Sequence, residues 1–128
     1  MVRVLVVDDH TAVLHALVDM LSFSVGLEVV GTAANANDAV ALLEGGTAVD
    51  VGVLDISMRG RGGLSLASEI STRWPAIRML MLSMHSAADY VMLTRRAGAH
   101  GYMNKKDAPE ELEEAILTLA RGGNFFPD

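Results

Sequence analysis

The sequence contains no cysteine, and it is poor in aromatic residues, which make up 5% of its 128 residues. Without cysteine, neither a disulfide framework nor a thiolate metal site is available. The chain also has no excess of positive charge, and its net charge is −6. Such a chain is a poor candidate for gripping the phosphates of a nucleic acid. The basic pairs Arg95–Arg96 and Lys105–Lys106 are too small to change this.

Long hydrophobic runs are lacking as well. The first apolar run ends at Asp8 and Asp9, too early for a secretory signal. No stretch approaches the roughly 18 apolar residues that a membrane span needs. We therefore expect a cytoplasmic protein without membrane association, and the length favours a single domain.

Apolar residues as a class are abundant, at 51% of the chain with a mean hydropathy of +0.32. Two interpretations stay open from composition alone. The apolar residues either fill the core well, or leave a patch for a partner or a second copy of the chain.

Short apolar runs alternate with segments of helical periodicity. In the segment 11–23, for example, Leu14, Leu17 and Leu21 fall on one helical face. Strict alternation of this kind favours an α/β fold, here an open doubly wound sheet of five parallel strands flanked by five helices. The predicted strands are 2–7, 27–33, 49–55, 77–83 and 100–104, and the predicted helices lie within 11–23, 35–46, 64–74, 86–98 and 108–123.

Polar residues stand where the predicted strands end. Asp8 and Asp9 end the first strand, Asp55 the third and Ser83 the fourth, while Lys105 follows the fifth. The carboxyl ends of parallel strands meet at one edge of an open sheet, where ligands bind. Like charges about 4 Å apart repel by about 4 kcal/mol at an effective dielectric constant near 20. We therefore expect a positive partner among the carboxylates.

The ligands offered at this edge are oxygen atoms, which selects a hard cation such as Mg²⁺, with Mn²⁺ as an alternative. A magnesium ion in proteins often shares its shell with a phosphoryl group. Lys105 can supply a positive charge for such a group and Ser83 a hydrogen bond. Asp55 stands alone at the end of a central strand and is the candidate phosphoryl acceptor. The four histidines fall on different elements, so we expect no histidine metal site.

The motifs "LVVDDH", "VLDISM", "MLSMHS" and "GYMNKK" together resemble the receiver domain of two-component response regulators, most closely the NarL/FixJ (LuxR-type) branch. The resemblance covers nearly the whole chain and implies a flavodoxin-like sheet of order 2-1-3-4-5. It implies that Asp55 is the phosphoacceptor. It also implies that Asp8, Asp9, Asp55 and the backbone carbonyl of Ser57 hold Mg²⁺.

The resemblance implies roles for three further residues. Ser83 matches the switch hydroxyl that bonds the phosphoryl oxygen, Lys105 the lysine that pairs with the phosphoryl group, and Tyr102 the aromatic residue that turns inward on activation. Two positions depart from the family pattern, since Arg59 and Lys106 stand where proline is usual. These departures put the loop geometry and the choice of kinase in doubt.

By the same resemblance, a sensor histidine kinase donates the phosphoryl group, and the receiver is no enzyme beyond its own phosphorylation and dephosphorylation. Residues 1–121 would form the receiver, and 122–128 would begin a linker to a helix-turn-helix output domain that binds DNA, with homodimerisation as one further output. The receiver itself would not contact nucleic acid. Three alternatives stay open: a stand-alone receiver, a phosphorylation-independent interaction module of the same fold, and a small hydrolase or phosphotransferase with an aspartyl intermediate.

Overall fold

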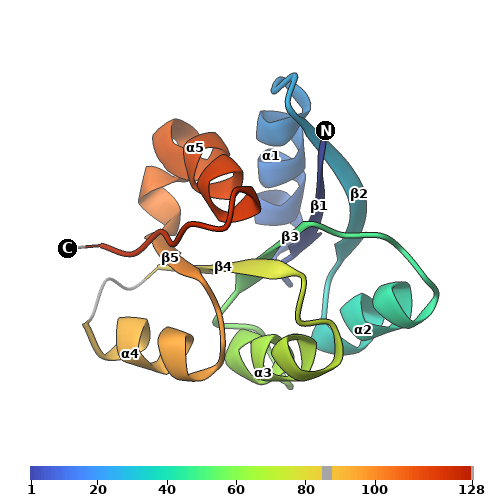
Figure 1. Ribbon diagram of the computed structural model, residues 1–128, viewed down its shortest axis with the longest axis vertical. Coiled ribbons are helices and arrows are strands. Elements are labelled where there is room, and N and C mark those ends of the chain that lie inside the picture. Colours follow the sequence, from blue (N-terminus) through green and yellow to red (C-terminus); the bar gives the residue numbers. More distant parts are fainter. Residues whose placement is uncertain (85–87, 128) are drawn as a thin grey trace.

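The computed structural model describes residues 1–84 and 88–127, and its five strands form one parallel sheet in the order β2-β1-β3-β4-β5 (Figure 1). Five helices connect and follow the strands, so the predicted doubly wound α/β fold and its strand order are confirmed. The strands are β1 (Val2–Val7), β2 (Leu27–Ala33), β3 (Val51–Asp55), β4 (Arg78–Ser83) and β5 (Gly101–Asn104). The helices are α1 (Thr11–Ser22), α2 (Ala36–Glu44), α3 (Gly63–Arg73), α4 (Ala88–Arg96) and α5 (Ala108–Ala120).

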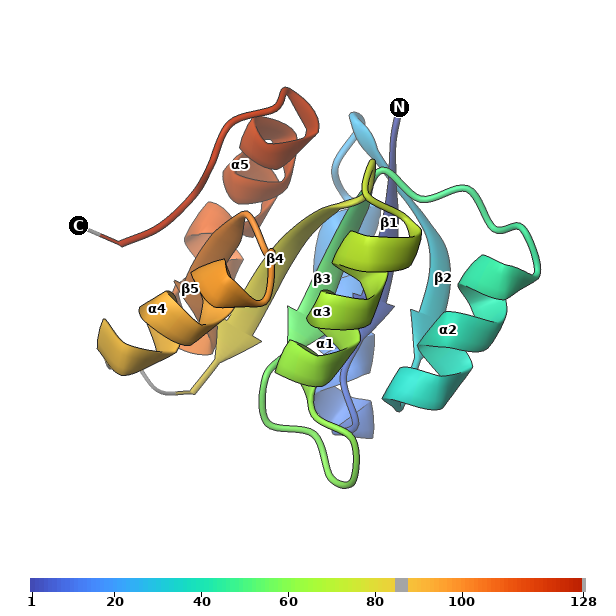
Figure 2. The same ribbon diagram turned by 60° about the horizontal axis from the view of Figure 1, so that its bottom comes forward.

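Helices cover both faces of the sheet, which explains why the strands are almost continuously apolar. Val4 and Val6 point into the layer under α1 and α5, whereas Leu5 and Val7 point into the layer under α2, α3 and α4 (Figures 1 and 2). These two layers absorb most of the apolar residues. Among the described residues, the large apolar side chains that stay exposed are Met1, Phe23, Val25, Met84, Met92 and Leu93.

The ends of the elements follow local chemistry, with small differences from the predicted ranges. Asn35 caps α2, because its side-chain oxygen accepts a hydrogen bond of 2.8 Å from the backbone N–H of Asp38. A short 3₁₀ turn, η1 (Lys105–Asp107), was not predicted; Asn104 opens it by accepting a hydrogen bond from the N–H of Lys106. Residues 85–87, where the predicted helix 86–98 begins, lie outside the described residues.

The C-terminal segment, residues 123–127, runs back along the outer edge of β5 (Figure 1). Phe125 pairs with Gly101 in parallel fashion, and its carbonyl accepts a 2.8 Å hydrogen bond from the N–H of Tyr102. A Cβ at Gly101 would lie 2.8 Å from that same carbonyl oxygen, so the close approach requires glycine. The guanidinium of Arg78 fixes the start of the segment by donating to the Gly123 carbonyl at 2.7 Å.

Within the described residues, no helix has the length and apolar character needed to cross a bilayer.

Candidate functional site

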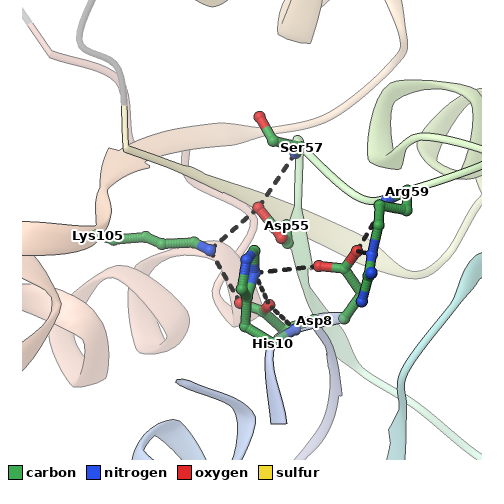
Figure 3. A network of polar contacts seen from close by, with 7 residues as sticks. Asp8, His10, Asp55, Ser57, Arg59 and Lys105 are labelled. Carbon is green, nitrogen blue, oxygen red and sulfur yellow. Dashed lines mark hydrogen bonds and ion pairs between the residues drawn. The ribbon is translucent and has the colours of Figure 1, made fainter. Parts of the chain in front are cut away.

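The carboxyl ends of β1 and β3 and the start of η1 bring three charged side chains together (Figure 3). The Nζ atom of Lys105 lies 3.0 Å from Oδ2 of Asp8 and 3.2 Å from Oδ1 of Asp55. One oxygen each of Asp8, Asp9 and Asp55 and one ring nitrogen of His10 all lie within 4.8 Å of one another. We call Asp8, Asp9, Asp55 and Lys105 the acidic pocket.

Two of these carboxylates also shape the turns that leave the sheet. Oδ1 of Asp8 accepts a 2.9 Å hydrogen bond from the N–H of His10, and Oδ1 of Asp55 accepts one of 3.2 Å from the N–H of Ser57. A carboxylate that bonds the N–H two residues further on is a common way to end a strand in a turn. The same local interaction therefore turns the chain toward the next helix and holds each carboxylate at the pocket.

The loop between β3 and α3 is glycine-rich, and one of its glycines packs against the pocket. A Cβ at Gly63 would overlap the carbonyl oxygen of Asp55, while the N–H of Gly63 donates to the carbonyl of Ile56 at 3.2 Å. Glycine here permits the first turn of α3 to pack directly on the end of β3.

The electrostatics of the pocket are unbalanced, because the described carboxylates outnumber the single ammonium group that contacts them. Burial, reinforced by the negative charge of Asp8, raises the pKa of Asp55, although Lys105 and the N–H of Ser57 oppose this. Burial also disfavours the charged form of Lys105. The hydrogen bond to Asp8 and the charges of Asp55 and Asp8 outweigh that effect and raise the pKa of Lys105.

Two oxygen atoms of the pocket, Oδ2 of Asp55 and Oδ1 of Asp9, are buried and accept no hydrogen bond. A buried acceptor without a donor costs about 1–3 kcal/mol, and more when it is charged. A hard cation would satisfy both oxygens and offset the excess negative charge. The donor set and its charge therefore fit Mg²⁺.

Two neighbours of Asp9 were missed by the sequence reasoning. His10 lies beside the pocket, with Nδ1 3.1 Å from Oδ1 of Asp9 and 3.4 Å from Oδ1 of Asp8. The histidines were expected to lie on different elements and to form no metal site, and among the described residues His10 is the one that the structure places next to the carboxylates. Its place directly after the acidic pair was the available signal. Arg59 donates its backbone N–H to Oδ2 of Asp9 at 2.8 Å. That hydrogen bond lowers the pKa of Asp9 against the opposing effect of burial, with help from the charge of His10.

The remaining predicted site residues lie on β4 and β5. Ser83 is fully buried at the carboxyl end of β4, one residue beyond Leu82, which pairs with Asp55 in the sheet. Tyr102 is 2% exposed and packs in the core layer that α3 and α4 cover. Both residues therefore lie on the strands that lead to the pocket.

This sheet with an acidic cluster at its carboxyl edge is the arrangement of a receiver domain, and comparison with known proteins agrees. Residues 4–117 match the response regulator receiver domain family. The chain therefore belongs to this family, and its relatives are of the NarL/FixJ (LuxR-type) branch.

Two curated relatives cover nearly all of this chain. It is 35% identical to the response regulator UvrY of Escherichia coli K12, covering 98% of this chain and 57% of UvrY. It is 34% identical to the DNA-binding transcriptional activator DevR/DosR of Mycobacterium tuberculosis, covering 98% of this chain and 58% of the relative. The chain thus spans less than two thirds of the length of these relatives.

Among solved structures, a LuxR-family two-component response regulator from Aurantimonas superposes with a TM-score of 0.90 at 32% identity. The superposition covers 96% of this chain and 87% of that one. Family membership, the fold and the pocket are therefore consistent with one another.

Proposed function

We propose that Asp55 accepts a phosphoryl group from the phosphohistidine of a sensor histidine kinase in a Mg²⁺-dependent reaction. The observation that carries this proposal is the Asp55 carboxylate itself. It stands at the end of the central strand β3, with Oδ1 held by Lys105 and Ser57 and with Oδ2 lacking any hydrogen bond. One oxygen is fixed in place, and the other, which is buried and has no donor, is the candidate to bond phosphorus.

In the proposed step, an oxygen of Asp55 forms a bond to phosphorus. The bond between phosphorus and the imidazole nitrogen of the donor breaks, and the nitrogen leaves with the electron pair. Lys105 stays beside the acceptor and pairs with the phosphoryl oxygens. The carboxylates of Asp8, Asp9 and Asp55 and the carbonyl of Ser57 would hold Mg²⁺, which supplies positive charge against that of the incoming group.

An apolar groove beside the pocket supports docking of the kinase at this edge. It runs between α1 and the start of α5, and its lining includes Val13, Met20, Met84 and Pro109 next to Lys105. A helix of a partner with apolar residues at helical spacing would fit such a groove and reach the acceptor.

We further propose that phosphorylation shifts a two-state equilibrium through Ser83 and Tyr102. The added charge, about −1.5 to −2 by analogy with other phosphorylated side chains, would attract the Ser83 hydroxyl. Tyr102 lies on β5, whose backbone pairs with the C-terminal segment. A change at Tyr102 would therefore reach that segment directly.

We propose that the C-terminal segment begins a linker to a DNA-binding output domain, and that phosphorylation controls this domain or homodimerisation. The relatives named as regulators support this, because this chain covers only 57–58% of their length. The exposed Met92 and Leu93 on α4 offer an apolar surface that could form part of such an interface.

The test is incubation with acetyl phosphate and Mg²⁺, followed by intact mass measurement. We expect one added phosphoryl group in the wild type and none in Asp55→Ala. Asp50→Ala is the matched control, because Asp50 immediately precedes the opposite end of the same strand, and we expect it to be labelled normally. Labelling that persists in Asp55→Ala would place the acceptor elsewhere. No labelling of the wild type would favour a phosphorylation-independent module.

A further inference from the structure

One oxygen of the Asp9 carboxylate is already held by a hydrogen bond within the chain, and the other lies close to His10. Oδ2 accepts the backbone N–H of Arg59 at 2.8 Å and lies 3.6 Å from Nε of the same residue. Oδ1 lies 3.1 Å from Nδ1 of His10. The side chain of Asp9 is 10% exposed, so these neighbours cover most of it. Any cation that binds Asp9 must compete with contacts already present.

The loop that carries Arg59 is fixed at two points by two arginines. Arg61 pairs with Glu69 at 2.6 Å and donates to the hydroxyl of Ser65 at 3.0 Å, both on α3. Arg59 instead contacts Asp9, fifty residues away in the sequence. Arg61 therefore attaches the loop to its own helix, whereas Arg59 attaches it to the acidic pocket.

The two contacts of Arg59 are of different kinds. Its guanidinium is 93% exposed, so it can leave Asp9 without loss of packing, and its charge acts through solvent. Its backbone N–H makes a short hydrogen bond that a proline at this position could not make. Both contacts stabilise Asp9 without a metal, and the guanidinium also repels an approaching cation.

We infer that Arg59 is a built-in counter-ion for Asp9. It holds the β3–α3 loop against the acidic pocket and lowers the affinity of that pocket for Mg²⁺. Arg59 is thus a positioning residue, and it acts through Asp9. This inference rests on the proposed function, because it takes the acidic pocket as the magnesium site. Binding of the cation and release of the loop are then one coupled event.

Mg²⁺ affinity can be measured directly by following backbone amide resonances of the pocket during a Mg²⁺ titration by NMR. We expect Arg59→Ala to bind Mg²⁺ about threefold more tightly than the wild type, as suits an exposed charge. Arg59→Pro, which removes the N–H as well, should bind still more tightly. Arg61→Ala is the matched control, since it removes the same charge from the same loop and frees that loop from α3 rather than from Asp9. Its affinity should equal that of the wild type.

Each outcome has a distinct meaning. Equal tightening in Arg59→Ala and Arg61→Ala would show a general effect of charge or of loop release that does not need the contact with Asp9, and it would overturn the inference. Unchanged or weaker binding in Arg59→Ala would overturn it too, while leaving the magnesium site in place. A failure of all four proteins to bind Mg²⁺ at the pocket would overturn the inference together with the magnesium part of the proposed function.

Discussion

The same two strands carry charged residues at both ends, and the two ends are built differently. At the amino ends of β1 and β3, Arg3 pairs with Asp50 through Nη2–Oδ1 at 2.9 Å and Nε–Oδ2 at 3.0 Å. At the carboxyl ends, Asp8 and Asp55 share the one ammonium group of Lys105. The first arrangement has one cation for one carboxylate, and the second has an excess of carboxylates.

The two ends also differ in how far their charged side chains are exposed to solvent. The side chains of Arg3 and Asp50 are 47% and 35% exposed, whereas those of Asp8 and Asp55 are each 1% exposed. The pKa values of Asp50, which immediately precedes β3, and of Asp55, which ends it, accordingly move in opposite directions. The hydrogen bond from Arg3 lowers the pKa of Asp50, while burial and the charge of Asp8 raise the pKa of Asp55.

The amino ends thus carry a structural ion pair, whereas the carboxyl ends carry the candidate binding site. Both oxygens of Asp50 have donors, so nothing remains for a ligand to satisfy. At the carboxyl end, charge is buried in excess and Oδ2 of Asp55 has no donor. A fold that keeps an unbalanced cluster of this kind gives up stability for function, as is common at active sites.

The largest effect on stability is expected from Lys105→Met. The change leaves Asp8 and Asp55 buried without their cation, and breaking a buried pair in this way costs about 3 kcal/mol or more. Urea unfolding at pH 7 measures it. Added Mg²⁺ should restore part of the loss in the variant, because it supplies charge at the same carboxylates.

Lys106→Met is the matched control, since the neighbouring lysine is exposed and contacts neither carboxylate. We expect its urea midpoint to stay near that of the wild type. If both variants lost equal stability, the contrast between the two ends of the strands would not hold.

A smaller effect of opposite sign is expected from Asp55→Asn, which removes one of the two buried like charges. We expect a gain of about 1 kcal/mol in the free energy of unfolding at pH 7. Asn resembles the protonated acid, and the pKa of Asp55 is raised in the folded state. As pH falls through that raised pKa toward 3.8, the buried carboxylate of the wild type takes up a proton. The difference in unfolding free energy between Asp55→Asn and the wild type should therefore shrink.

Urea unfolding at pH 7 and pH 5 tests this sign, with Asp50→Asn as the control at the other end of β3. The pKa of Asp50 is lowered in the folded state, so its charge stabilises the fold above the ordinary value of 3.8. Asp50→Asn should therefore lose stability at pH 7. A loss in both variants would contradict the comparison.

The comparison also shows which features were predictable from sequence. The strands and the edge at which Asp8, Asp55 and Lys105 meet followed from apolar runs that end in polar residues, because parallel strands are buried on both faces. The contact between Arg59 and Asp9 could not be predicted. It joins residues fifty positions apart through a backbone N–H, and no periodic pattern reports such a contact.

The same holds for the C-terminal segment. Residues 122–128 were expected to begin a linker, but the pairing of Phe125 with β5 depends on an edge that exists only after the sheet has formed. The requirement for glycine at position 63 is of this kind too, since it arises from the approach of α3 to the carbonyl of Asp55. Local sequence specifies the elements, and the packing between them decides these contacts.

The smallest effect is expected from Arg3→Ala. An exposed ion pair contributes little, because solvent screens it and two long side chains must be ordered to form it. We expect the urea midpoint to fall by roughly a fifth or less of the shift in Lys105→Met, since Asp50 returns to water rather than staying buried without a partner. Repeating the measurement in about 1 M NaCl should remove most of the remaining difference from the wild type. A loss that matched Lys105→Met and persisted in salt would mean that burial does not distinguish the two charged ends of these strands.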